Sequence, residues 1–266
     1  ENIIAAIVIS NIEDGAFSDT LAQAIFADPA IQDKLIQNIL AEAKAKNAKD
    51  IHVDFEYLRK EDRQAYVDFL KKLKEAAKGL ALSVALAPKT SATQVGKWYE
   101  GHDYKQIGEV ADFVVIMTYE WGYSGGPPMA VSPIGPVREV LTYALTEIPG
   151  NKIMMGQNLY GYDWTLPFKV GNPNAKALSP KQAIELARER NAAISYDTKS
   201  QAPYFNYWLD GKEHVVWFED ARSINAKFEL IKELGLRGIS YWHIGFPFPQ
   251  NWLLLNELFQ VKKVQS

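Results

Sequence analysis

Apolar and polar positions along the chain form two alternating patterns. Continuous apolar runs, which are typical of strands buried on both faces, alternate with segments whose apolar residues recur at helical spacing. The runs predict strands at 3–10, 51–57, 80–88, 113–120, 152–161 and 238–246. One helical pattern begins with Asp28 as the predicted N-cap and Pro29 as the first helical residue. Two further helical patterns cover 60–78 and 133–148. Strands separated by helices predict βαβ units and a parallel sheet in an α/β fold.

The segment 162–218 departs from this pattern. Ser179, Pro180 and Gln182 predict a capped helix, since they fit the N-cap, N1 and N3 positions. Three short strands follow, and Asp210-Gly211 between the second and the third is a typical hairpin turn. These strands are predicted at 195–198, 204–209 and 214–218. We therefore expect a barrel-type unit at 1–161 and 219–266, with a small α+β insertion at 162–218.

Composition narrows the possible functions. The 266 residues carry a net charge of −3 with scattered Lys and Arg, which gives no reason to expect nucleic acid or an anionic membrane as a partner. No apolar stretch is long enough to span a bilayer, and a missing leader pattern decides nothing about secretion. The absence of Cys and of closely spaced His excludes the commonest metal sites, and no phosphate loop is present, so we expect no metal and no cofactor.

The predicted strand 51–57 places carboxylates where a buried strand is normally apolar. His52, Asp54 and Glu56 share one face because side chains alternate along a strand. Burying two neighbouring carboxylates costs several kcal/mol unless hydrogen bonds or proton sharing offset it. A charged strand end that emerges into solvent is the structural alternative.

Polar and aromatic residues also end the other predicted strands. The active sites of (β/α)₈ barrels are built at the carboxyl ends of their strands, so this pattern favours a site for a sugar or another polar ring. Core tyrosines with satisfied hydroxyls are the alternative for any single member. The residues are Asp54, Glu56, Tyr119, Glu120, Trp121, Gln157, Asn158, Tyr160, Tyr241, Trp242 and His243.

Three motifs carry a resemblance to a known family. Asp54-Phe55-Glu56, Met117-Thr118-Tyr119-Glu120 and Tyr241-Trp242 resemble glycoside hydrolase family 18. Longer segments resemble its spore cortex-lytic N-acetylglucosaminidases, which usually carry LysM modules upstream. This resemblance covers the chain from Ile3 to about Lys262 and implies a TIM-type (β/α)₈ barrel. It begins at the family's third strand, so we expect the first two βα units to lie outside this sequence.

The resemblance implies retaining hydrolysis assisted by the substrate. Glu56 would be the general acid, and Asp54 and Tyr119 would hold the 2-acetamido group that attacks as nucleophile. Trp242 would form the apolar floor beneath the sugar. The expected substrate is spore cortex peptidoglycan or another N-acetylglucosamine glycan, outside the cell or in the spore coat or cortex, with no obligate protein partner. The further expected substrate-binding residues are His52, Glu120, Trp121, Gln157, Asn158 and Tyr160.

Two positions depart from the family pattern. His52 replaces the outer Asp of Asp-x-Asp-x-Glu, and Glu120 replaces the usual Asp after Met-x-Tyr. Two alternative functions on the same scaffold are those of a chitinase and of a glycan-binding module without activity. Lectin-like relatives typically lose the acid, so the presence of Glu56 favours an enzyme.

Overall fold

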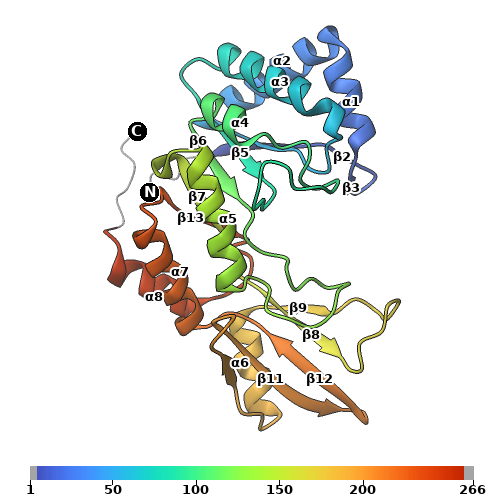
Figure 1. Cartoon of the computed structure of the whole chain (residues 1–266), viewed down its shortest axis with the longest axis vertical. Coiled ribbons are helices and arrows are strands. Elements are labelled where there is room, and N and C mark those ends of the chain that lie inside the picture. The colour runs from blue at the N-terminus through green and yellow to red at the C-terminus, as the bar shows by residue number, and fades with distance from the viewer. Residues whose placement is uncertain (1–4, 261–266) are drawn as a thin grey trace.

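A six-stranded parallel sheet forms the centre of the computed structural model, which describes residues 5–260 (Figure 1). The strand order is β1-β4-β5-β6-β7-β13. Neighbours in this sheet therefore follow one another in chain order, apart from the strands between them that belong to other sheets. The strands are β1 (Ala6–Ser10), β4 (Asp50–Asp54), β5 (Ala81–Leu86), β6 (Phe113–Ile116), β7 (Ile153–Asn158) and β13 (Gly238–Trp242). The predicted parallel α/β sheet is confirmed, although residues 3 and 4 of the first predicted strand lie outside the described residues.

Helices cover the outer face of this sheet (Figure 1). Asp28 caps the second helix, where its carboxylate accepts hydrogen bonds from the backbone N–H groups of Ala30 and Ile31, as the sequence predicts. The helices are α1 (Asp19–Ala27), α2 (Pro29–Ala45), α3 (Arg63–Ala76), α4 (Tyr104–Val110), α5 (Ile134–Glu147), α7 (Ala221–Glu233) and α8 (Pro249–Leu258). Short 3₁₀ turns lie at Lys60–Asp62 and Gly150–Lys152, and a small hairpin of β2 (Ile12–Glu13) and β3 (Ala16–Phe17) follows β1.

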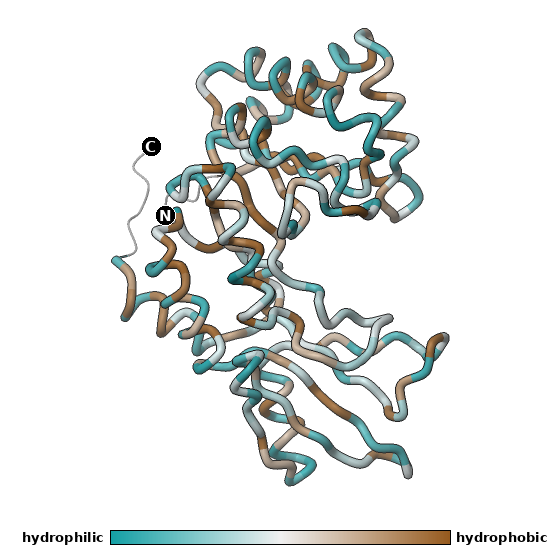
Figure 2. The backbone as a smooth tube through the Cα atoms, in the orientation of Figure 1, coloured by the Kyte–Doolittle hydropathy of each residue, from teal (hydrophilic) through white to brown (hydrophobic). Residues whose placement is uncertain are grey.

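The main core lies between the sheet and these helices. Ile51 and Val53 of β4 are fully buried, and Phe55 stacks on Tyr66 and Phe69 of α3. Figure 2 shows the same division, with hydrophobic strands inside and hydrophilic turns on the outward side of the helices. Because one face of β4 is committed to this core, His52 and Asp54 point to the opposite face of the sheet.

Several strands end earlier than predicted. The predicted strand 51–57 stops at Asp54, because the backbone N–H and C=O of Glu56 bind the side chain of Asn11 instead of a neighbouring strand. The predicted strand 238–246 stops at Trp242, where the chain turns and Phe246 N–H binds the carbonyl of His243. The predictions 80–88, 113–120 and 152–161 are also too long at their carboxyl ends, where loops begin, whereas the strand predicted at 3–10 ends at Ser10 as expected.

The sheet has two free edges among the described residues. β1 and β13 are its outer strands, and Val8 of β1 is 60% exposed. The six strands therefore form an arc of barrel type and not a closed eight-stranded barrel.

A second, antiparallel sheet follows β7. Its order is β10-β11-β12-β8-β9, and α6 (Pro180–Glu189) packs against one face. The predicted capping box of Ser179 and Gln182 is present, and Asp210 and Gly211 form the turn between β11 and β12 with positive φ angles. The strands are β8 (Gly161–Thr165), β9 (Lys176–Leu178), β10 (Ser195–Asp197), β11 (Ala202–Leu209) and β12 (Lys212–Trp217). The sequence interpretation missed β8 and β9.

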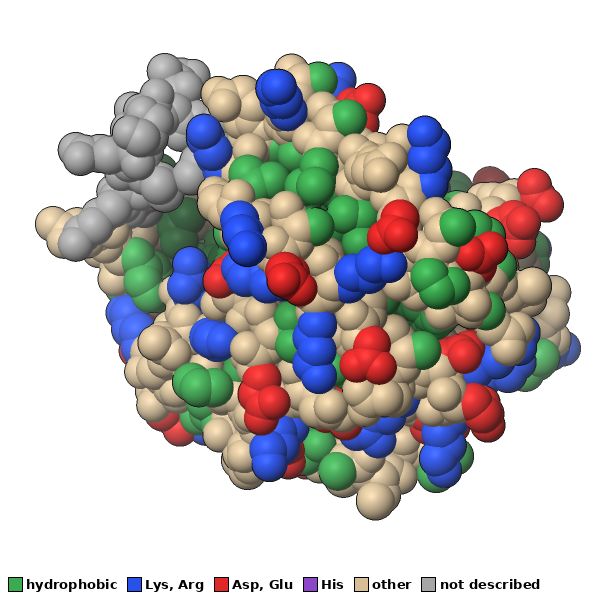
Figure 3. All heavy atoms as spheres, turned by 90° about the horizontal axis from the view of Figure 1, so that it is seen from above, with side chains coloured by type: hydrophobic (Ala, Val, Ile, Leu, Met, Phe, Trp, Pro, Cys, Tyr) green, Lys and Arg blue, Asp and Glu red, His purple; other side chains and the backbone are tan. Residues whose placement is uncertain are grey.

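The surface has no single dominant charge on the face seen from above, where side chains of both signs are interspersed (Figure 3). Among the helices that the structure describes, none is long and apolar enough to cross a membrane.

Candidate active site

Glu56 lies two residues beyond β4, and the side chain of Asn11 fixes its backbone. Asn11 directly follows β1 and is fully buried. Its amide oxygen accepts the Glu56 N–H at 2.9 Å, and its amide nitrogen donates to the Glu56 carbonyl at 2.9 Å. The same nitrogen donates to the carbonyl of Ser18 at 3.0 Å. Asn11 therefore replaces the missing strand ladder and sets the direction of the Glu56 side chain.

The environment of Glu56 favours its protonated form. The residue is only 9% exposed. Burial, reinforced by the nearby charge of Asp54, raises the pKa of Glu56 to about 7, although the indole N–H of Trp98 donates to Oε2 and acts in the opposite direction. A carboxyl with this pKa holds a proton near neutral pH and can also release it, as general acid–base catalysis requires.

Asp54, the last residue of β4, has one engaged and one free oxygen. The hydroxyl of Ser10 donates to Oδ2 at 3.3 Å. Oδ1 is buried and has no hydrogen-bond partner within the described part of the chain. Burial raises the pKa of Asp54. The free oxygen is thus suited to accept an N–H group or to share a proton.

His52 belongs to a chain of polar contacts below Asp54. The hydroxyl of Ser83 donates to Asp50 Oδ2 at 2.7 Å and lies 2.8 Å from His52 Nδ1. Since a hydroxyl has one hydrogen, His52 must donate from Nδ1 while Asp50 is ionised. Burial lowers the pKa of His52 to about 4. His52 is therefore a neutral ring near neutral pH.

Tyr119 and Glu120 follow β6, and Tyr119 lies near Asp54 and Glu56. Burial raises the pKa of Tyr119, and the charges of Asp54, Glu56 and Glu120 add to this effect, which places all four groups in one neighbourhood. A Cβ on Gly156 would lie 3.0 Å from the Tyr119 ring, so the glycine leaves space for that ring.

Glu120 is held by two tyrosines from the start of the second sheet. Its Oε1 accepts hydrogen bonds from the hydroxyl of Tyr160 and, at 2.9 Å, from that of Tyr162. Burial raises the pKa of Glu120. These contacts connect the carboxyl ends of β6 and β7 to β8.

A cavity of about 200 Å³ lies beside these residues. Trp98, Tyr99, Tyr119, Glu120 and Trp121 are among the residues that line it. Aromatic faces beside carboxyl groups are suited to a sugar, which presents both C–H faces and hydroxyls.

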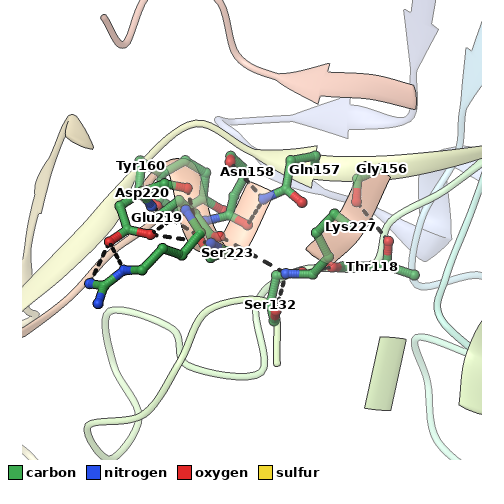
Figure 4. A network of polar contacts seen from close by, with 11 residues as sticks. Thr118, Ser132, Gly156, Gln157, Asn158, Tyr160, Glu219, Asp220, Ser223 and Lys227 are labelled. Atoms are coloured by element: carbon green, nitrogen blue, oxygen red, sulfur yellow. Dashed lines mark hydrogen bonds and ion pairs between the residues drawn. The ribbon is translucent and has the colours of Figure 1, made fainter. Parts of the chain in front are cut away.

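Gln157 and Asn158 lie at the carboxyl end of β7 and are fully buried (Figure 4). Gln157 donates to Asn158 Oδ1 at 2.9 Å, and Asn158 donates to the carbonyl of Tyr160 at 2.7 Å. In this arrangement both residues support the backbone of Tyr160, so their predicted contact with substrate stays a prediction.

A buried lysine anchors the loop that carries Tyr119. Lys227 Nζ donates to the carbonyl of Ser132 at 2.6 Å, and the Ser132 hydroxyl donates to the carbonyl of Thr118 at 2.6 Å (Figure 4). Glu219, also buried, lies 3.9 Å from Lys227 Nζ. A buried charge is costly without a partner, so this ion pair and its hydrogen bonds hold the backbone directly before Tyr119.

Trp242 ends β13, four strands from β4 in the sheet order. Its ring is 56% exposed and meets the ring of His243 edge-on. Its backbone pairs with Asn158, so it lies at the same edge of the sheet as the other site residues. The structure gives it no direct contact with Glu56, and its role as a floor stays a prediction.

The sequence interpretation missed several residues of this site. Asn11 directly follows a predicted strand, so the rule used for the other strand ends would have included it. Trp98 and Tyr162 lie in a loop and in a missed strand, where no local pattern indicates contact with Glu56 or Glu120. In the described ranges, no group of His, Asp or Glu is arranged to hold a metal ion.

Comparisons with known proteins agree with the resemblance. The family model described as "Glycosyl hydrolases family 18" matches residues 7–246. The cortical fragment-lytic enzyme of Bacillus subtilis is 58% identical over 99% of this chain and 62% of its own length. The crystal structure of the spore cortex-lytic enzyme SleL of Bacillus megaterium superposes with a TM-score of 0.96 at 59% identity, over 99% of this chain and 61% of that one.

A chitinase structure is more distantly similar. The enzyme from Chromobacterium violaceum has a TM-score of 0.88 at 30% identity and covers 97% of this chain and 81% of its own. The chain thus spans only about three fifths of the length of the two spore enzymes, but most of the chitinase.

Proposed function

Because this chain belongs to family 18 of the glycosyl hydrolases, we propose that it hydrolyses glycans that contain N-acetylglucosamine, with spore cortex peptidoglycan as its substrate. The observation that carries the proposal is the Glu56 carboxyl, whose pKa is raised to about 7 beside Asp54. The choice of cortex peptidoglycan rests on the similarity to the two spore enzymes. It implies that the protein acts in the spore coat or cortex or outside the cell.

We propose a retaining reaction in which the substrate supplies the nucleophile. Glu56 gives its proton to the glycosidic oxygen while the 2-acetamido carbonyl oxygen attacks the anomeric carbon, so the leaving sugar departs and an oxazolinium forms. The Glu56 carboxylate then takes a proton from water, which attacks the same carbon and opens the ring. The free Oδ1 of Asp54 accepts the acetamido N–H, and its charge stabilises the cation.

The remaining residues bind the sugar in this proposal. Tyr119 donates its hydroxyl to the acetamido oxygen, and Trp242 supplies an exposed apolar face. Glu120 and Trp121 contact sugar hydroxyls and a ring face in the adjoining cavity. We further propose that 1–161 and 219–266 form the catalytic unit and that 162–218 is a small α+β insertion.

Chitin oligosaccharides are the second candidate substrate, because the similar chitinase covers 97% of this chain. A module that binds glycans without cleaving them is disfavoured by Glu56. Digestion of purified cortex peptidoglycan and chitooligosaccharides in parallel, with mass analysis of the new reducing ends, separates these functions. We expect new N-acetylglucosamine reducing ends from the cortex material.

A matched pair of substrates tests the mechanism. Replacing the 2-acetamido group by hydroxyl removes the nucleophile but leaves the glycosidic bond intact. We expect such a substrate to bind without turnover and a thiazoline analogue of the oxazolinium to inhibit competitively. Hydrolysis of the 2-hydroxy substrate at a comparable rate would show that a protein carboxylate is the nucleophile.

A further inference from the structure

A second cavity lies on the insertion sheet, away from Glu56. It has a volume of about 790 Å³ and is lined by residues of the β8–β9 connection and of the β11–β12 hairpin near its turn. The residues that matter in its lining are Phe168, Lys169, Asn172, Trp208, Lys212 and Glu213. None of them takes part in the site around Glu56.

Trp208 is the most informative residue of this cavity. Its side chain is 67% exposed, although a tryptophan gains much free energy when it is buried. It pairs with Glu213 in the β11–β12 ladder, one pair before the turn, so its backbone is held by the sheet. The indole is thus a fixed apolar surface that solvent covers in the free protein.

The strand register places Trp208 on the same sheet face as the candidate active site. Trp208 pairs with Glu213, and Trp217 of the same strand pairs with Tyr162, whose hydroxyl binds Glu120. From Trp217 to Glu213 the strand spans roughly 13 Å. The opposite face is covered by α6. On this face Trp164 and Val215 lie between Tyr162 and Trp208 and are buried under the loops that carry Val131, Leu166, Phe168 and Ala175. A chain of several sugars bound at Glu120 therefore passes over these loops to reach Trp208.

The charges around the indole favour an anionic ligand. Lys169 and Lys212 both line the cavity, and within the described residues neither forms an ion pair. The single carboxylate of the lining, Glu213, accepts a hydrogen bond from Asn206 at 2.9 Å. Asp210 belongs to the hairpin turn and is not part of the lining. Two cations against one engaged carboxylate leave the cavity with net positive charge.

We propose that this cavity is a distal subsite for a long glycan that carries carboxylates. One sugar ring stacks on Trp208, and a carboxylate-bearing substituent of the same glycan binds Lys169 and Lys212. Stacking supplies apolar contact, and the ammonium groups distinguish this glycan from a neutral one. This inference rests on the proposed function, because the distal subsite binds a part of the same substrate beyond the cleaved bond.

Ligand titration in a Glu56→Gln background tests the subsite without hydrolysis. The probes are long soluble peptidoglycan fragments and an N-acetylglucosamine disaccharide, which fills only the site near Glu56. Adding Trp208→Ala is expected to weaken binding of the long fragments about tenfold and to leave the disaccharide unchanged. Trp208→Phe keeps an aromatic face and should restore most of the affinity. Val170→Ala, at a 97% exposed position of the neighbouring loop, is the control.

The lysines are tested by removing charge from either partner. Lys212→Gln should weaken binding of the long fragments, and amidation of their carboxyl groups should abolish this effect. Lys199→Gln, at an exposed position outside the cavity, controls for overall charge.

Three results would overturn the inference: no binding of the long fragments, an unchanged affinity with Trp208→Ala, or an equal loss for the disaccharide. If the protein with Glu56 fails to hydrolyse the fragments while their binding still depends on Trp208, the proposed function is wrong and the distal subsite stands.

Discussion

Glu56→Gln should stabilise the folded protein at alkaline pH while it abolishes hydrolysis. The substitution keeps the size of the side chain and an oxygen that accepts the Trp98 indole hydrogen bond, but it removes the ionisable group. The pKa of Glu56 rises from 4.5 to about 7 on folding because burial and Asp54 disfavour the carboxylate. Each pKa unit corresponds to about 1.4 kcal/mol, so ionised Glu56 costs the folded state about 3 kcal/mol.

The sign follows from linkage. A carboxyl whose folded pKa lies above its unfolded pKa binds protons more tightly in the folded state, so it stabilises the fold fully below about 4.5 and loses this contribution as pH rises through about 7. Above that range the wild type should be less stable than Glu56→Gln by up to about 3 kcal/mol. The difference should shrink towards pH 5, where the wild-type carboxyl is protonated.

Denaturant unfolding at pH 5 and pH 8.5 measures this difference, with Glu109→Gln as an exposed control that should change little. Hydrolysis should fall by orders of magnitude in Glu56→Gln only, since an amide cannot deliver the proton. An equal stability difference at both pH values would refute the argument, because Glu56 would then titrate as it does in the unfolded chain. Near wild-type turnover would refute its role as the acid.

The remaining predictions concern residues around Glu56. Trp98→Phe removes a hydrogen bond that lowers the pKa of Glu56, so the alkaline limb of the pH–rate profile should move to higher pH; a shift to lower pH would contradict the contact. Asn11→Ala removes the bonds to the Glu56 backbone and should destabilise the fold by about 1–3 kcal/mol and lower kcat more than it raises KM, as unfolding and steady-state kinetics would measure. Trp242→Ala should weaken glycan binding by about 1–3 kcal/mol, and an unchanged affinity in titration would show that Trp242 does not contact the sugar.

The sequence alone determined the order and type of the main strands. The buried runs and the residues between them predict a parallel sheet, because local apolar spacing follows directly from strand and helix geometry. The same pattern predicts that Asp54 and Glu56 sit at a strand's carboxyl end. It also predicts the capping box at Ser179 and the turn at Asp210, since both depend on residues close together in the chain.

The tertiary structure alone decided how the site is assembled. The strand containing Asp54 ends there because Asn11, 45 residues from Glu56, takes over its backbone hydrogen bonds. The pKa of Glu56 depends on burial and on the Trp98 indole, a partner 42 residues away. Strand lengths and pKa values of this kind depend on groups that meet only after folding, and no local pattern in a single sequence contains that information.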